Sequence, residues 1–336
     1  MAPVLGLTAN GDLGVILKAG LTQYRYAFRS SPYAGRNSLT AEYATGVNVF
    51  RIVGTMDRRT EGSRLHLTLR ARMSEFEVVN FHGLGNSTPS GSAEYFRVQQ
   101  RQWLLQPALA LGLSDRSDIS LGPVVQYSTT DGAPGSFLAA TTPYGAGNFG
   151  QAGVRLGVFI DKRDRARDPR NGILLDVAGT WYPGIWDVKG AFSVVAAATA
   201  AYVTLPVPLH PVLVVRGAAR KVSGDFPFHE SSFLGGRGSV RTLDLQRYAG
   251  DGSLSGTTEL QVPLVRFPLI LPFDLGMYGF LDAGRVYVSG ASPGGWHTGT
   301  GVGLWLGVLN PSTAVNLELG DRPGQSFVRV RTGLNF

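Results

Sequence analysis

The sequence of 336 residues has no cysteine, and this absence limits the chemistry open to it. Without cysteine the chain has neither a disulfide framework nor a thiolate metal site. Histidine is also scarce, and the five histidines lack the close spacing of metal ligands: His66, His82, His210, His229 and His297. We therefore expect no metal and no cofactor.

Long apolar runs are rare as well. Residues 190–215 form an apolar, uncharged run of the length that a membrane helix needs, but Pro206, Pro208 and Pro211 interrupt it. The mean hydropathy is only +0.04. A helical membrane protein has a clearly positive mean hydropathy, because apolar stretches of about 20 residues recur along its chain. We interpret 190–215 as two strands around a proline-rich turn.

Features of nucleic-acid binding and of catalysis are also lacking. The net charge is +7, but the lysines and arginines are spread through the chain and form no basic helix, so we expect no nucleic-acid partner. The Gly-x-Ser-x-Gly match at residues 290–294 and the glycine-rich stretches near Gly150 and Gly235 follow no strand-to-helix pattern, so the sequence offers no nucleophile elbow and no phosphate loop. We predict that the chain is not an enzyme, that Asp161 to Asp168 form a salt-bridged turn, and that His229 and Glu230 are exposed loop residues.

Alternating polarity is what the sequence has in abundance. Leu65, Leu67 and Leu69, for example, alternate with His66 and Thr68, as expected for a strand with one apolar and one polar face. Turn residues separate about sixteen such segments: 3–9, 12–26, 37–45, 48–58, 63–75, 94–112, 117–130, 150–162, 172–183, 188–204, 211–222, 253–265, 273–289, 299–309, 313–320 and 326–336. This pattern predicts an all-β transmembrane antiparallel β-barrel of about 16 strands.

The spacing of these segments supports a membrane barrel. Such barrels have short turns at the periplasmic end and long loops outside. The longest predicted gaps, 76–93, 131–149 and 223–252, all follow odd-numbered segments and therefore share one end.

The last eleven residues alternate up to an aromatic end. Val328 and Phe336 fall on one face, and Arg329 and Gly333 fall on the other. We expect this strand to close the barrel against the first segment, whose Gly6 should weaken the seam. Residues 1–4 do not resemble a secretory signal, so we expect the natural amino terminus of a barrel to lie upstream.

Several motifs follow one another in the last third of the chain. Residues 233–243 read FLGGRGSVRTL, residues 258–264 read TELQVPL, and residues 280–284 read FLDAG. With the aromatic terminal strand, this order resembles the bacterial surface-antigen barrel family, which includes BamA and TamA. Residues 80–88 and 164–172 also look like upstream segments of that family.

The resemblance implies a sixteen-stranded barrel with a long loop folded into the lumen. By position, the docking arginine is Arg241 and its acidic partner is Asp282, while alternation also turns Glu259 inward. Gly235, Gly236 and Val240 belong to the same loop motif. The sequence departs from the family at residues 242 and 243, where Thr and Leu replace Gly and an aromatic residue.

The function expected from the resemblance is insertion of proteins into the bacterial outer membrane, or translocation across it. We expect one barrel domain over residues 1–336, without POTRA or catalytic domains. The expected partners are outer-membrane lipid and lipopolysaccharide, and unfolded outer-membrane or secreted proteins. Two alternatives stay open: a barrel that anchors a larger secreted phosphoesterase or patatin-like protein, and a diffusion porin.

Overall fold

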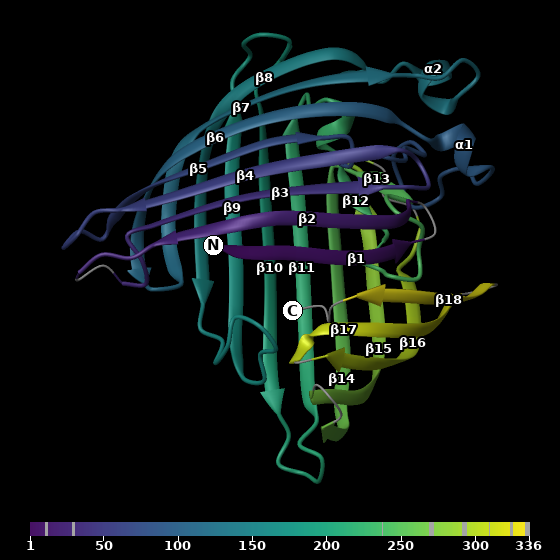
Figure 1. The fold of residues 1–336 in the computed structure, drawn as a ribbon. Coiled ribbons are helices and arrows are strands. Elements are labelled where there is room, and N and C mark those ends of the chain that lie inside the picture. Colours follow the sequence, from purple (N-terminus) through teal and green to yellow (C-terminus); the bar gives the residue numbers. More distant parts are fainter. Residues whose placement is uncertain are drawn as a thin grey trace.

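The computed structural model forms one large antiparallel sheet curved into a barrel (Figure 1). It describes residues 1–336 except 11–12, 29–30, 237, 269–271, 291–293, 309, 323–324 and 333–336. Sixteen strands follow one another in the sheet in chain order, and β12 and β13 pair separately as a small hairpin. The predicted barrel class is confirmed.

The strands of the barrel agree closely with the sixteen predicted segments. Their bounds are β1 (Ala2–Asn10), β2 (Gly14–Arg25), β3 (Gly35–Ala44), β4 (Val49–Arg59), β5 (Leu65–Ser74), β6 (Gln99–Ser114), β7 (Ser117–Asp131), β8 (Gly147–Asp161), β9 (Gly172–Tyr182), β10 (Phe192–Thr204), β11 (Val212–Gly224), β14 (Gly252–Pro268), β15 (Pro272–Tyr287), β16 (His297–Val308), β17 (Asn310–Arg322) and β18 (Gln325–Thr332). The interpretation of 190–215 as two strands is correct, since β10 and β11 lie there. No helix in the described part of the chain is long and apolar enough to cross a membrane.

The predicted strand at 94–112 begins too early. The segment 94–112 was expected to be extended throughout, but its first residues form the short helix α1 (Ala93–Phe96), and β6 starts only at Gln99. The side chain of Ser92 caps this helix by accepting a hydrogen bond from the backbone N–H of Tyr95. Such a cap satisfies a backbone donor that a strand would have paired with its neighbour.

Alternation along the strands separates an outer apolar face from an inner polar one. On β17, Leu317 is 46% exposed and the neighbouring Asn316 is 1% exposed. Two further groups show the same alternation: Leu260, Leu264 and Leu319 face outward, while Glu259, which was predicted to point inward, lies inside with Gln261 and Glu318. Val262 is half-buried, next to a β-bulge between Pro263 and Val265, and the side chain of Val315 lies outside the described set.

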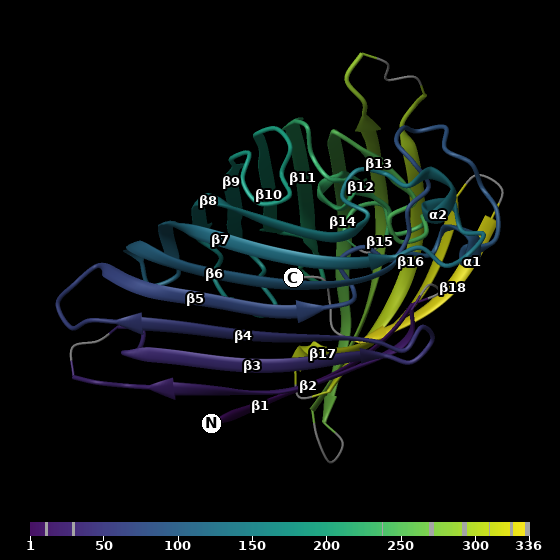
Figure 2. The same cartoon turned by 90° about the horizontal axis from the view of Figure 1, so that it is seen from above.

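The long connections gather at one end of the barrel, as the gap lengths predicted (Figure 2). They carry α1, α2 (Phe137–Thr141), the short helix η1 (Phe228–Glu230), β12 (Ser232–Leu234) and β13 (Tyr248–Gly250). Below them, residues of β2 to β11, of β14 and of the loops line cavities of about 390, 430 and 800 Å³. Arg70 and Gln106 line both of the two larger cavities, which therefore adjoin inside the barrel.

The seam lies between the first and the last strand of the sheet. β1 and β18 run side by side (Figure 1), with Cα atoms within 8 Å of each other. Backbone pairings join each strand to the next from β1 through to β18, but none joins β18 to β1 among the described residues.

Candidate functional site

The connection between β11 and β14, residues 225–251, folds back against the inner wall of the barrel. β12 leads into a sharp turn at Gly235 and Gly236, whose φ angles are +120° and +83°. This left-handed region favours glycine. A Cβ at Gly235 would collide with the carbonyl oxygen of Asp244. The two glycines therefore allow the loop to turn toward the inner wall, and Arg241 follows five residues after Gly236.

Arg241 is held by two carboxylates from neighbouring strands. Its Nε and Nη2 donate to the two oxygens of Asp282 at 3.0 and 3.1 Å, and its backbone N–H donates to the same side chain at 2.9 Å. Its Nη1 donates to Glu259 Oε2 at 2.6 Å. Two parallel hydrogen bonds to one carboxylate fix both the position and the direction of a guanidinium. With the side chain 2% exposed, the loop is fixed at this residue.

Three strands supply the wall of this site. β14 contributes Glu259, β15 contributes Asp282 and Phe280, and β17 contributes Glu318, whose Oε2 lies 3.9 Å from Arg241 Nη1. The guanidinium carbon lies 3.8 Å from the centre of the Phe280 ring, within cation–π range.

The carboxylates have partners of their own. The hydroxyl of Thr257, which lies opposite Asp282 in the β14–β15 register, donates to it at 2.8 Å. Gln261 donates to Glu259 at 2.8 Å. Burial alone would lower the pKa of Arg241, but the attraction of Glu259 and Asp282 is stronger and raises it. The guanidinium therefore stays charged and bound.

Apolar and small residues complete the docking site. Val240 and Leu243 pack in a buried cluster with Leu234 and Val286. Thr242 lies against Gly299 of β16, where a Cβ would collide with it. The departures from the family motif at residues 242 and 243 thus lie within the docked segment.

Comparison with known families decides what kind of barrel this is. A family model described as the Omp85 superfamily domain matches residues 35–319. The chain belongs to the Omp85 superfamily. No curated protein matches its sequence.

Solved structures show the same fold for this Omp85 chain. BamA from Haemophilus ducreyi lacking POTRA domains 1–3 is similar with a TM-score of 0.69 and 12% identity, over 98% of this chain and 69% of that one. CdiB from Escherichia coli gives 0.61 and 12%, and CdiB from Acinetobacter baumannii gives 0.55 and 13%. The match covers 98% of this chain in both cases, but only 62% and 59% of the two CdiB chains.

The remaining residues expected at functional positions belong to the predicted seam. Gly6 lies in β1, opposite Lys18 of β2. Gly333 and Phe336 lie outside the described residues, although the strand expected there is present up to Thr332 as β18.

Sequence reasoning missed a second anchor of the loop. His229 and Glu230 were expected to be exposed, which is wrong: they are 7% and 9% exposed. Glu230 Oε1 accepts hydrogen bonds from Gln126 at 3.1 Å and Gln151 at 2.8 Å, and its Oε2 accepts one from Arg220 at 2.6 Å. The aromatic residues at 226 and 228 were a signal of burial here.

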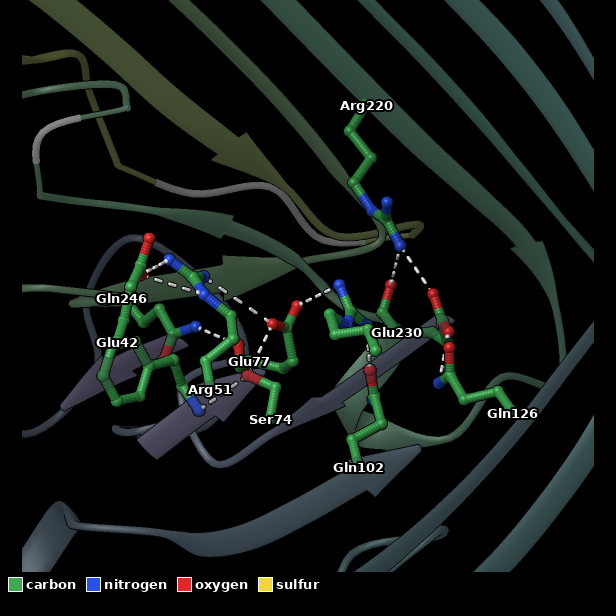
Figure 3. A network of polar contacts seen from close by, with 11 residues as sticks. Glu42, Arg51, Ser74, Glu77, Gln102, Gln126, Arg220, Glu230 and Gln246 are labelled. Atoms are coloured by element: carbon green, nitrogen blue, oxygen red, sulfur yellow. Dashed lines mark hydrogen bonds and ion pairs between the residues drawn. The ribbon is translucent and has the colours of Figure 1, made fainter. Parts of the chain in front are cut away.

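The second anchor adjoins a polar network along the inner wall (Figure 3). Glu77 binds Arg72 at 2.8 Å and accepts a hydrogen bond from Ser74 at 2.9 Å, while Arg51 pairs with Glu42. Gln246 of the loop donates to the backbone oxygen of Glu77 at 2.6 Å. The loop therefore contacts the β3–β5 side of the barrel as well as the β14–β17 side.

The acidic and basic residues at 161–168 form the predicted salt-bridged turn. Arg163 Nε donates to Asp161 at 2.9 Å, and Arg165 lies 3.7 Å from Asp164 and 3.9 Å from Asp168. Within the described ranges no group of three His, Asp or Glu residues could hold a metal ion.

Proposed function

We propose that this Omp85 barrel lies in the bacterial outer membrane as a multi-pass protein and inserts proteins into that membrane or translocates them across it. The observation that carries the proposal is the seam. β1 and β18 lie side by side, yet no backbone ladder joins them among the described residues. A strand edge that is not held in a continuous ladder can pair with an incoming strand.

The proposal fits the two faces of the wall. Outward leucines such as Leu260 and Leu317 suit contact with lipid and lipopolysaccharide, and the proposed substrates are unfolded outer-membrane or secreted proteins. We further propose that residues 1–336 form a single barrel domain. A plain diffusion porin is disfavoured because the loop carrying Arg241 occupies part of the lumen.

The test is insertion of a substrate by the purified barrel. Vesicles that contain the chain receive a urea-unfolded eight-stranded outer-membrane barrel, and heat-modifiable migration on a gel measures how much of it folds. We expect faster folding than in vesicles without the chain. The chain has no cysteine, so pairs of cysteines placed along β1 and β18 can be oxidised to lock the seam.

Locking should return the rate to that of empty vesicles, and reduction should restore it. Folding at the rate of empty vesicles in every case would reject insertion of this substrate. A barrel that merely anchors another domain would give that result.

A further inference from the structure

The segment from Val240 to Arg247 lies across the seam on the inner side of the barrel. Its first half is seated on the C-terminal strands: Arg241 binds Glu259 and Asp282, and Thr242 lies against Gly299. These positions belong to β14, β15 and β16, which lead to β18 at the seam. One side of the seam is thus tied to the first half of the segment.

The second half of the segment is seated on the N-terminal strands. Leu245 packs against a buried cluster formed by Leu13, Ala44 and Val79. Leu13 immediately precedes β2, Ala44 ends β3, and Val79 belongs to the loop after β5. Arg241 and Leu245 are four residues apart, yet they contact opposite sides of the seam.

The side-chain amide of Gln246 is hydrogen-bonded to the backbone of residues 77–80. Its Oε1 accepts hydrogen bonds from the backbone N–H groups of Val79 at 2.7 Å and Asn80 at 3.2 Å. Its Nε2 donates to the oxygen of Glu77 at 2.6 Å. Asn80 in turn donates from its side chain to the oxygen of Leu245 at 2.9 Å.

The backbone of Gln246 supports the same interpretation. Its φ angle is +56°, a left-handed conformation that a residue other than glycine adopts at a cost. The surrounding contacts hold it there. A glutamine in this conformation places its amide against residues 77–80, which a continuing extended chain would not do.

A second contact ties the same two sides together. The side chain of Asn86, in the loop after β5, donates to the oxygen of Val286 at 2.8 Å and accepts from the N–H of Val286 at 3.0 Å. Val286 lies in β15. The β5–β6 loop is therefore bound both to the segment 240–247 and to the C-terminal wall.

β1 cannot move away from β18 without stretching the segment 240–247 or breaking these contacts. Four residues reach at most about 14 Å when fully extended. Here the chain is not extended, because the N–H of Leu243 donates to the oxygen of Val240 in a tight turn. That turn is buried with Leu234 and Val286, so lengthening the segment would break a packed cluster.

We propose that residues 240–247 are a seam strap, with Arg241 as its anchor on the C-terminal side and Leu245 and Gln246 as its anchor on the N-terminal side. Gln246 is a positioning residue that limits how far β1 and β18 separate. The strap rests on the proposed function in that it regulates the strand edge through which substrate would enter. Its release from the outer loops would widen the seam without unfolding the wall.

The experiment measures the seam directly, in the full chain and without substrate. Spin labels on Leu5→Cys of β1 and Val328→Cys of β18, both outward-facing, report the distance across the seam in vesicles. Gln246→Ala removes the amide of the strap. Gln100→Ala is the matched control, because Gln100 is a buried glutamine that bonds Thr130 within the β6–β7 pair, away from the seam.

We expect Gln246→Ala to show a second, longer distance population that the unsubstituted chain and Gln100→Ala lack, with heat-modifiable migration retained in all three. Leu245→Ala is the second variant and should behave like Gln246→Ala. An unchanged distance distribution in folded Gln246→Ala and Leu245→Ala would overturn the strap. Failure of both to fold, while Gln100→Ala folds, would also overturn it, because the contacts would then be needed for the barrel itself.

The outcome separates the strap from the proposed function. A widened seam in Gln246→Ala, with no insertion by any variant, would retain the strap and reject insertion. An unchanged seam in Gln246→Ala, in a chain that inserts substrate, would reject the strap and retain insertion.

Discussion

At the scale of single residues, Arg241 faces two carboxylates at hydrogen-bonding distance and a third at 3.9 Å. Removing the arginine would leave Glu259, Asp282 and Glu318 close together without their main counter-charge. Breaking a buried ion pair by removing one partner costs about 3–5 kcal/mol. We therefore expect Arg241→Ala to lower the free energy of unfolding by about that amount in a urea titration of the folded barrel.

The matched control is Arg165→Ala. Arg165 pairs with Asp164 in an exposed turn, where such pairs contribute about 0–1 kcal/mol. Equal losses for the two variants would show that the Arg241 site does not stabilise the barrel.

Two histidines of the outer loops should make those loops sensitive to acid. Burial lowers the pKa of His229 to about 4, although Glu230 opposes the shift, and burial together with Arg247 lowers the pKa of His82 to about 4. An unfolded histidine has a pKa of about 6.5 and so binds more protons in this window. The stability that these two neutral histidines contribute is thus fully present above about pH 6.5. It decreases toward pH 4, by up to about 1.4 kcal/mol per pH unit for each histidine.

Hydrogen exchange, corrected for the intrinsic rate, should therefore be faster in residues 225–251 at about pH 5 than at about pH 7.5. The difference should shrink in His229→Gln. It should persist in His210→Gln, because His210 lies in an exposed turn between β10 and β11. If the pH dependence of exchange is unchanged in His229→Gln, groups other than His229 cause it.

At the scale of the strand, alternation places neighbouring residues in different surroundings, one facing lipid and the next facing the water-filled lumen. Leu105 and Gln106 lie near the middle of β6, with Leu105 49% exposed on the outer face and Gln106 lining two cavities. Arginine at a lipid-facing position near the bilayer midplane costs about 2–4 kcal/mol. We expect Leu105→Arg to lose about that much stability in refolding titrations and Gln106→Arg much less. Similar losses would contradict the facing of β6.

Strands were predictable because their signal is local. A period of two needs only the residues of one strand, so the outward facing of Leu67 and the inward facing of His66 followed from the sequence. The pairing of Arg241 with Asp282 was expected from family resemblance together with strand parity. The contacts of Glu230 and Gln246 were not predictable, because their partners other than Arg220 lie about 80 to 170 residues away and depend on how the loop crosses the barrel.

At the scale of the whole molecule, the loop and the cavities share one interior. Gly238, Ser239 and Arg241 line the cavity of about 390 Å³ together with residues of β9, β10, β11 and β14. Deleting residues 235–247 should therefore raise the single-channel conductance in planar bilayers, since it empties part of the lumen. Deleting residues 133–135, at the tip of an outer loop, should leave the conductance unchanged. Equal conductance in the two deletions would show that the loop does not restrict the lumen.

The Arg241 site also implies an order of events in folding. Its carboxylates come from β14, β15 and β17, and the glycine that receives Thr242 comes from β16. A hairpin can form from its own two strands, but this pocket does not exist until four consecutive strands have come into register. Docking of the loop is therefore a late step, and it occurs only in chains whose C-terminal hairpins have already assembled.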